Sequence, residues 1–228
     1  MTPIRSERNQ KPKASIDRWA FERVCWGEGK LRIAGVDEAG RGPLAGPVVA
    51  AAVVFPPAWG VEGLPEEIHG LNDSKQLSEA KRDRFYVSLM ASSAIRYGIG
   101  MVEASVIDEI NILQATHRAM NLALAQLSPP ATHALVDGMP VRTLSLPQTA
   151  IVKGDGLSYS IAAASVLAKV TRDRLMKQHD ATWPGYGFAI HKGYPTPQHL
   201  EALARLGPCP IHRKSFAPVR DLQQQLPL

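Results

Sequence analysis

The sequence predicts a mixed α/β sheet of five strands, and three observations point to this fold class. Short apolar segments ended by turn residues recur along the chain and predict strands. Longer segments with apolar residues at helical spacing predict helices. In chain order they give three strands, a helix, two strands and a helix. Consecutive strands usually form hairpins, whereas a strand reached through a helix is normally laid parallel in the same sheet, so both pairings are expected.

Five strands are predicted from β-branched or alternating apolar sequence. The first ends where Asp37 interrupts an apolar run, and the second ends at Pro56 and Pro57, which do not fit the middle of a sheet. The fourth ends at Asp137, directly before Gly138. The predicted ranges are 31–36, 48–55, 95–102, 132–136 and 149–153.

Four helices are predicted from helical spacing and from end signals. They cover 15–26, 104–127, 158–179 and 196–206. The last has the clearest ends, because Thr196 is a favourable N-cap, Pro197 suits the first helical position and Gly207 follows the final turn.

Basic residues are concentrated toward both ends of the chain and acidic residues in its middle. Residues 1–30 carry seven Lys and Arg against four Asp and Glu, 31–168 carry ten against thirteen, and 169–228 carry nine against four. This distribution suits a protein that gathers carboxylates around a cation and holds a polyanion beside them. Solvated surface charge produces the same imbalance more often.

The rest of the composition excludes several classes of protein. Cys25 and Cys209 are far apart and belong to no CxxC pair, so neither a disulfide framework nor a structural zinc site is expected. The first thirty residues are charged and hold no apolar segment typical of a signal peptide. No run approaches the roughly 20 apolar residues that span a membrane. We therefore expect a cytoplasmic protein without membrane contact.

Three acids follow predicted strands and indicate a cation site. Asp37 and Glu38 come at the end of the first strand, and Asp137 at the end of the fourth. Ligands of open α/β sheets bind beyond the carboxyl ends of strands, so we expect these acids at one edge. Converging carboxylates without a His or Cys pattern are typical ligands of magnesium or manganese. The alternative, an ordinary acidic turn after a strand, is the more frequent role of an Asp-Glu pair.

The loop after this acid pair favours the cation site. In the run DEAGRGP at 37–43, two glycines flank Arg41, so the backbone is free to approach a ligand while the guanidinium offers a fork for phosphate. The longer run GVDEAGRGPLAGPV at 35–48 closely resembles the signature of ribonuclease HII. Other segments match this family in the same order, namely LNDSKQL at 71–77, VDG at 136–138, KGD at 153–155, IAAASVLAKVTRD at 161–173, HKGY at 191–194 and HRKSF at 212–216.

The resemblance covers about residues 31–216 and implies a ribonuclease H-like fold. In this fold a mixed five-stranded sheet carries helices on both faces, here with a small C-terminal helical segment. We accordingly expect a basic N-terminal extension at 1–30, a ribonuclease H-like catalytic core at 31–185 and a C-terminal helical substrate-binding segment at 186–228. Only about thirty residues precede the expected core, which disfavours the related ribonuclease HIII with its large N-terminal domain.

The resemblance also implies four catalytic acids that bind metal, namely Asp37, Glu38, Asp137 and Asp173. Ser165, Lys169 and Asp173 lie at i, i+4 and i+8 of the long predicted helix, so Asp173 belongs to a polar stripe that is able to face the acid edge. The alternative is an ion pair on the helix surface among Lys169, Arg172 and Asp173.

The activity implied by the resemblance is that of a metal-dependent endoribonuclease. It would hydrolyse the RNA strand of RNA–DNA hybrids and incise at ribonucleotides embedded in duplex DNA, leaving 3′-hydroxyl and 5′-phosphate ends. The expected cofactor is Mn²⁺ or Mg²⁺, with one ion bound without substrate and two with it, about 4 Å apart. Because protons compete with the metal for the carboxylates, we expect activity to fall in acid.

Substrate contacts are implied in two further segments. The backbone of Gly40, Arg41 and Gly42 would contact 2′-hydroxyls around the cleavage site, and Tyr194 would contact the ribose at an RNA–DNA junction. A single tyrosine is more often a half-buried packing residue, but the position of Tyr194 in HKGYPT favours a functional role.

Four basic residues are candidates for salt-sensitive contacts to the nucleic-acid backbone, although each alone is equally an ordinary solvated charge. They are Lys75, Lys169, Arg213 and Lys214. Asp73 and Asp155 are expected to cap a turn or a helix. None of the seven histidines is assigned to the site.

The expected partners are RNA–DNA hybrids and DNA duplexes that contain ribonucleotides, bound by a monomer. The tail QQQL at 223–226 weakly resembles a sliding-clamp peptide but lacks the aromatic pair such peptides carry. Two alternatives remain. A non-catalytic hybrid-binding protein would have no use for four converging acids, and another nuclease of the same fold, such as an integrase or a junction resolvase, would not need the glycine-arginine-glycine loop.

Overall fold

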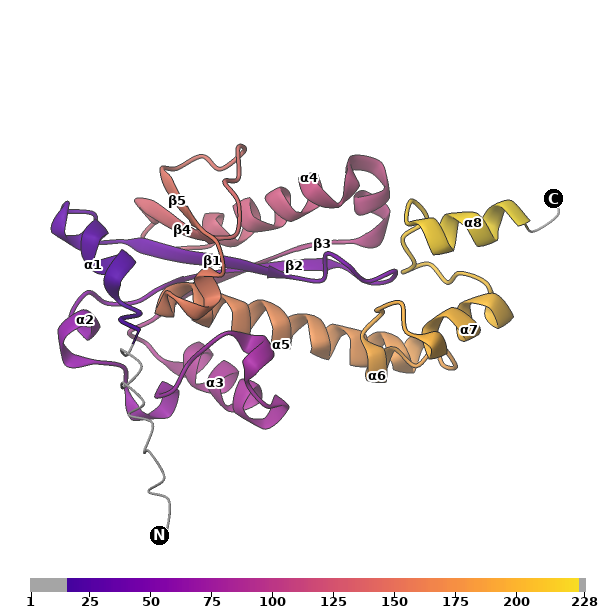
Figure 1. Ribbon diagram of the computed structural model, residues 1–228, viewed down its shortest axis with the longest axis horizontal. Helices are drawn as coiled ribbons and strands as arrows, with labels where there is room; N and C mark the ends of the chain where they lie inside the picture. The colour runs from indigo at the N-terminus through magenta and orange to yellow at the C-terminus, as the bar shows by residue number, and fades with distance from the viewer. Residues whose placement is uncertain (1–15, 226–228) are drawn as a thin grey trace, which may run out of the picture.

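A computed structural model describes residues 16–225, and the chain folds around one five-stranded sheet. The strand order is β3-β2-β1-β4-β5, which confirms the predicted mixed sheet (Figure 1). The strands are β1 (Ile33–Ala39), β2 (Val48–Val54), β3 (Arg96–Val102), β4 (His133–Asp137) and β5 (Gln148–Ile151).

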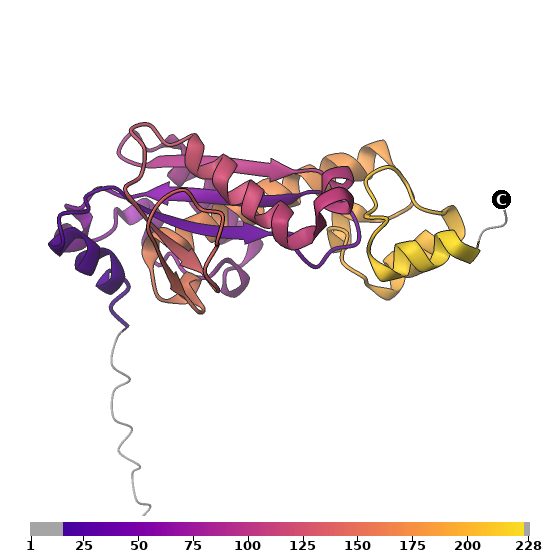
Figure 2. The same cartoon turned by 90° about the horizontal axis from the view of Figure 1, so that it is seen from above.

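Helices cover both faces of this sheet, as expected. The longest are α4 (Ala104–Ala125) and α5 (Tyr159–Thr182), which lie on opposite faces, and α3 (Glu79–Ala91) packs beside α5. Figure 2 shows α4 crossing the strands. Strand β2 is buried on both faces, because Ala50 and Ala52 pack on the α4 side while Ala51 and Val53 pack on the α5 side.

Two connections differ from the predicted hairpins, and one of them also changes the direction of a strand. Strands β2 and β3 are antiparallel but are joined by a long segment that contains α2 (Trp59–Glu62) and the unpredicted helix α3. Strands β4 and β5 are parallel, so the expected hairpin between them is wrong. The connection from β4 returns along the sheet without a helix, held where the Gln148 side chain bonds both the N–H and the C=O of Val141, each at 2.8 Å.

The first strand is also longer than predicted and includes the acid pair. Asp37 pairs with Ala51 and Glu38 with Ala50 of β2, so the strand does not break at Asp37. On its other side, β1 pairs with β4 only as far as Val36. Beyond that point the strand keeps one neighbour, which leaves its β4 side open beside the acids.

Close backbone approach brings the start of α5 onto β1. A Cβ atom at Gly35 would lie 2.1 Å from the Ser160 carbonyl carbon, so only glycine fits there. The N-terminal helix α1 (Ala20–Gly27) reaches the same place, where the buried carboxylate of Glu22 accepts hydrogen bonds from the Ser158 and Ser160 hydroxyls, both at 2.6 Å.

The C-terminal part carries three helices, α6 (Phe188–His191), α7 (Pro197–Leu206) and α8 (Ala217–Gln225). Thr196 caps α7 as predicted, because its hydroxyl accepts from the His199 N–H at 3.2 Å. The division of the chain at residue 185 stays a prediction. Three short 3₁₀ turns complete the elements: η1 (Glu66–Ile68), η2 (Ser74–Gln76) and η3 (Gly154–Gly156). Within residues 16–225 no helix has the length and apolar character needed to cross a membrane.

Candidate metal centre

Three carboxylates from three separate elements meet at the open edge of β1. Asp37 of β1, Asp137 at the end of β4 and Asp155 of η3 each offer an oxygen atom within 4.8 Å of the other two. The sheet register explains the first pair, because Asp37 and Asp137 each come one residue after the last paired residues, Val36 and Val136. Parallel β4 and β5 run to the same edge, which brings Asp155 beside them.

Backbone N–H groups hold two of these carboxylates. The Gly154 N–H donates to Asp137 Oδ1 at 2.7 Å, and the Glu38 N–H donates to Asp37 Oδ1 at 2.7 Å. Each acid keeps its second oxygen clear of these bonds, so the cluster is able to offer ligand atoms without losing the contacts that orient it.

Burial and mutual repulsion make the carboxyl groups of this site harder to ionise. Burial raises the pKa of Asp37 well above its usual range, and the charges of Glu38 and Asp137 raise it further. Burial likewise raises the pKa of Glu38. The pKa of Asp155 rises to about 6, first through burial and then through Asp137 and Asp73, against the opposing effect of Lys75.

Among the described residues, Lys75 is the only lysine within ion-pair distance of this cluster. The Lys75 Nζ atom is 3.8 Å from Asp155 Oδ2, too far for a good hydrogen bond. A set of buried carboxylates with so little compensation favours a bound cation. All three clustered ligands are carboxylates, a donor set that fits magnesium or manganese and not the nitrogen and sulfur ligands of zinc.

Asp155 is the site residue that sequence reasoning missed. Its expected role as a helix cap is wrong, because Ser158 caps α5 by accepting from the Ile161 N–H at 3.2 Å. The error follows from the expected hairpin, which would have sent the end of β5 to the opposite edge of the sheet. With β4 and β5 parallel, the acid after β5 belongs beside Asp137, the acid that ends β4.

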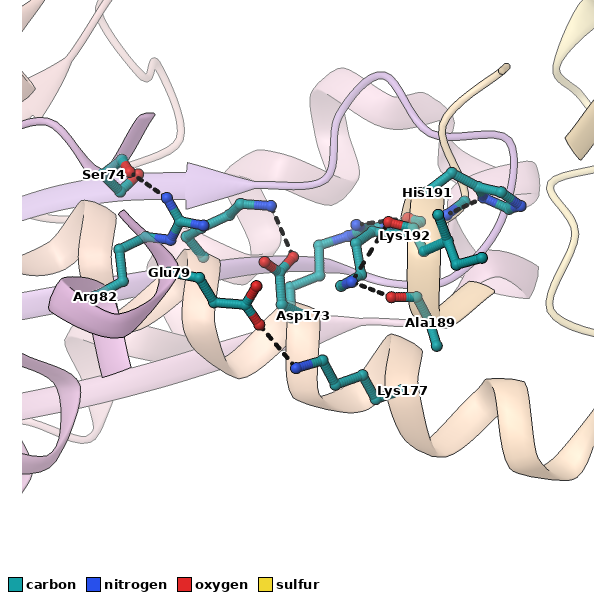
Figure 3. Close-up of polar contacts among 12 residues, drawn as sticks. Ser74, Glu79, Arg82, Asp173, Lys177, Ala189, His191 and Lys192 are labelled. Atoms are coloured by element: carbon teal, nitrogen blue, oxygen red, sulfur yellow. Dashed lines mark hydrogen bonds and ion pairs between the residues drawn. The ribbon is translucent and has the colours of Figure 1, made fainter. Parts of the chain in front are cut away.

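Asp173, in contrast, is not among the clustered acids. It does lie on the same stripe of α5 as Ser165, which lines a hollow together with Glu38. Eight residues of helix nevertheless separate Asp173 from Ser165, or about 12 Å along the axis. The Lys169 ammonium group donates to Asp173 Oδ1 at 2.7 Å, the ion pair given above as the alternative. Figure 3 shows Asp173 among Glu79, Lys177 and Lys192.

Six of the predicted substrate residues line one hollow of about 340 Å³, called here the Tyr194 hollow. Its lining includes Glu38, Gly40, Arg41, Gly42, Lys75, Lys169 and Tyr194. The Arg41 guanidinium lies 3.5 Å from Glu38 Oε1, but 52% of the Arg41 side chain is exposed. Tyr194 is 42% exposed, so both residues are open to a ligand. The loop 38–42 is therefore brought together with Lys75, Lys169 and Tyr194, which are distant from it in sequence.

The turn that carries Tyr194 is held by two histidines. The Gly193 N–H donates to His191 Nδ1 at 3.1 Å, and His199 Nδ1 lies 2.9 Å from the Tyr194 carbonyl oxygen. Burial lowers the pKa of His199, which favours the neutral ring with its proton on the nitrogen that donates to this carbonyl. These histidines position the tyrosine and lie away from the acids.

Arg213 does not contact solvent, so its expected contact with the substrate backbone is wrong. The side chain is fully buried and donates to the carbonyl oxygens of Gly40 at 2.6 Å, Arg41 at 2.9 Å and Gly46 at 3.0 Å. Burial, together with the neighbouring charge of Arg172, lowers the pKa of Arg213 to about 9. Arg213 therefore supports the glycine-arginine-glycine loop from beneath. Lys214 is exposed and lies outside the Tyr194 hollow.

The mixed sheet and its converging carboxylates define a metal-dependent nuclease of the ribonuclease H-like class. The family model described as Ribonuclease HII matches residues 34–219. The chain belongs to the ribonuclease HII family, and it is accordingly a metal-dependent endoribonuclease that acts on RNA–DNA hybrids. The alternatives of a non-catalytic binding protein and of a different nuclease on this fold are thereby excluded.

Individual relatives are similar over most of their length. Ribonuclease HII of Ruminiclostridium cellulolyticum is 56% identical over 197 residues, covering 86% of this chain and 74% of the relative. Ribonuclease HII of Geobacter metallireducens is 52% identical, and the match covers 89% of this chain and 92% of the relative. Among solved structures, ribonuclease H2 from Pyrococcus horikoshii OT3 superposes with a TM-score of 0.70 at 28% identity, covering 85% of this chain and 98% of that one. A ribonuclease HIII structure, at 17% identity and TM-score 0.67, shares the fold.

Proposed function

We propose that this protein also incises duplex DNA at single embedded ribonucleotides and leaves 3′-hydroxyl and 5′-phosphate ends. The observation that carries this proposal is the Tyr194 hollow. In it the loop 40–42 and Tyr194 lie beside Glu38, the neighbour of Asp37 in the sequence. An exposed aromatic side chain beside this hollow suits the recognition of a single ribose.

The metal ligands in this proposal are Asp37, Glu38, Asp137 and Asp155. Their carboxylates bind Mn²⁺ or Mg²⁺, one ion without substrate and a second with it. A divalent cation held by these carboxylates would lower the pKa of a coordinated water molecule and would stabilise the leaving oxygen. The chain orients the carboxylates through the N–H groups of Gly154 and Glu38. The second oxygens of Asp37 and Asp137 then stay available as ligands.

Sugar selection falls to the loop 40–42 and to Tyr194. Gly40 has a φ of +95°, and a Cβ atom there would meet the buried Arg172 side chain at 2.1 Å, so the backbone of this loop lies where only glycine permits it. A backbone N–H presented in this way recognises a 2′-hydroxyl, which DNA lacks. The exposed Tyr194 ring closes the other side of the hollow and contacts the ribose face.

Lys75 and Lys169 supply phosphate contacts in the same hollow. The ammonium group of Lys169 is fixed by Asp173, so we assign Asp173 to positioning this lysine in place of metal binding. Burial lowers the pKa of Lys75, but four nearby carboxylates, with Asp37 and Asp155 first, together raise it above its usual value, which keeps the ammonium charged.

The proposed location is the cytoplasm, and the proposed state is a monomer. Cys25 and Cys209 are both free and buried, as is usual in a reducing compartment. A sliding clamp is a further proposed partner. A solved complex of PCNA with RNase HII from Archaeoglobus fulgidus, 24% identical to this chain, has the same fold. The candidate tail at 223–226 ends outside the described residues.

Cleavage of a duplex with one embedded ribonucleotide tests the proposal. With Mn²⁺ or Mg²⁺, the wild type should cut once, on the 5′ side of the ribonucleotide, and Asp37→Asn should abolish cutting and so exclude a contaminating nuclease. Asp155→Asn should abolish it as well, whereas Asp173→Asn should mainly raise KM. A long hybrid that is cut while the single-ribonucleotide duplex stays intact would refute the incision activity.

A further inference from the structure

A second hollow, of about 640 Å³, opens on the other side of the acids. It is called here the Lys153 hollow. Asp137 and Asp155 line it, whereas Glu38 lines the Tyr194 hollow, and Lys75 lines both. The metal centre therefore stands between two hollows that meet at one lysine.

The N-terminal segment forms part of the wall of the Lys153 hollow, through Ile16 and Arg18, and hydrogen-bonds to other parts of it. Arg18 Nε donates to the Gly156 carbonyl oxygen at 3.1 Å and Arg18 Nη1 to that of Leu71 at 2.8 Å, which ties the segment of Asp155 to the turn of Lys75. The Tyr159 N–H returns a bond to the Arg18 carbonyl oxygen at 3.1 Å. Trp19 is buried in the core next to Arg18. Of the residues that line this hollow, Ile16 and Arg18 precede residue 34, where the match to the family model begins.

The chemistry of this hollow suits a nucleic-acid strand. Lys75 and Lys153 are exposed cations in its lining, and Lys75 has 77% of its side chain exposed. The apolar side chains of Ile16 and Val152 also line it and are 62% and 67% exposed. Ammonium groups attract phosphates, and exposed aliphatic side chains pack on sugars and bases. Small anionic metabolites would not need the apolar part.

We propose that the Lys153 hollow binds the substrate strand on the side of the scissile phosphate opposite to Tyr194, with Lys153 as a phosphate contact. This inference rests on the proposed function, because a strand cut at the acids has to continue past them in both directions. The Tyr194 hollow accommodates one direction, and the Lys153 hollow is the adjoining space that accommodates the other.

The test compares Lys153→Gln with Lys81→Gln, an exposed lysine of α3 that lines neither hollow. Glutamine removes the charge and keeps the length of the side chain. Two sets of labelled duplexes carry one ribonucleotide near the 5′ end or near the 3′ end of its strand. Binding is measured by fluorescence anisotropy with Ca²⁺, a hard cation suited to the same carboxylates, over a range of salt concentrations. Cleavage is followed separately with Mn²⁺.

Lys153→Gln should weaken binding about fivefold for one set only and reduce the slope of log Kd against log salt by about 1 for that set. Lys81→Gln should bind both sets like the wild type. The inference is overturned if Lys153→Gln binds both sets like the wild type, or weakens both equally. If the wild type binds but does not cut either set, the incision activity fails, while the anisotropy data still decide the role of Lys153.

Discussion

Replacing Asp155 by asparagine separates its role as a ligand from its effect on the stability of the metal-free protein. Asparagine has nearly the same shape as aspartate but carries no charge. In the wild type, the pKa of Asp155 is raised to about 6 from the ordinary 3.8 by burial, Asp137 and Asp73. The folded protein therefore holds the Asp155 proton more tightly than the unfolded chain does, and ionisation of this carboxyl costs stability.

The size and sign of the effect follow from this shift. The rise from 3.8 to about 6 corresponds to at most about 3 kcal/mol of stability, and screening by solvent reduces this value. For a carboxyl with a raised folded-state pKa, this stability is present below pH 3.8 and is lost as the pH rises through about 6. In metal-free buffer, Asp155→Asn should therefore be more stable than the wild type by about 2 to 3 kcal/mol at pH 8, and the gain should shrink toward pH 4.

Added Mn²⁺ should reverse this order, because the wild type gains binding energy that the variant lacks. At a concentration 100 times Kd, a ligand that binds only the folded state adds about 2.7 kcal/mol. Urea unfolding with EDTA and with Mn²⁺, at pH 5 and pH 8, measures both effects, and calorimetric titration measures the Mn²⁺ affinity. Asp173→Asn is the matched control and should keep the wild-type affinity. An Asp155→Asn variant that binds Mn²⁺ as tightly as the wild type would remove Asp155 from the centre.

Three further substitutions have defined outcomes. Tyr194→Phe should slow cutting at a single ribonucleotide more than cutting of a long hybrid, and equal effects in both assays would contradict a ribose contact. Glu22→Gln should raise stability to urea at pH 8 and much less at pH 5, because burial raises the pKa of Glu22 and its charge is lost in acid; an equal gain at both values would refute this. Arg213→Lys should lower the unfolding free energy by about 2 kcal/mol, since buried carbonyl groups lose donors. Its binding to duplexes should keep the wild-type salt slope, and a slope reduced by about 1 would instead indicate a phosphate contact.

The loop 40–47 is hydrogen-bonded to α5 and to the C-terminal part of the chain. Its carbonyl groups accept from two buried arginines, Arg172 at Ala45 and Pro47 and Arg213 at Gly40. The guanidinium of Arg172 also donates to the Lys192 carbonyl oxygen at 2.9 Å, two residues before Tyr194. The loop 40–47 and the segment that precedes Tyr194 are thus both held by the Arg172 side chain of α5, which fixes their spacing.

The sequence alone was sufficient for features that depend on neighbouring residues. The acid pair Asp37 and Glu38, the glycines around Arg41 and the cap at Thr196 are all local patterns. Each depends on short-range sterics or hydrogen bonding, so residue order determines it without knowledge of the fold. The five strands were likewise predicted from apolar periodicity, which records which segments are buried.

Only the tertiary structure decided which distant residues join those patterns. The direction of β5 determined that Asp155 lies beside Asp137. The helical spacing placed Asp173 on the face of α5 that carries Ser165, but it did not show how far along the helix the acid cluster lies. Burial made Arg213 a support for the loop although its charge had indicated a phosphate contact. Strand direction, distance along a helix and burial are set by packing between remote segments, and no short stretch of sequence contains them.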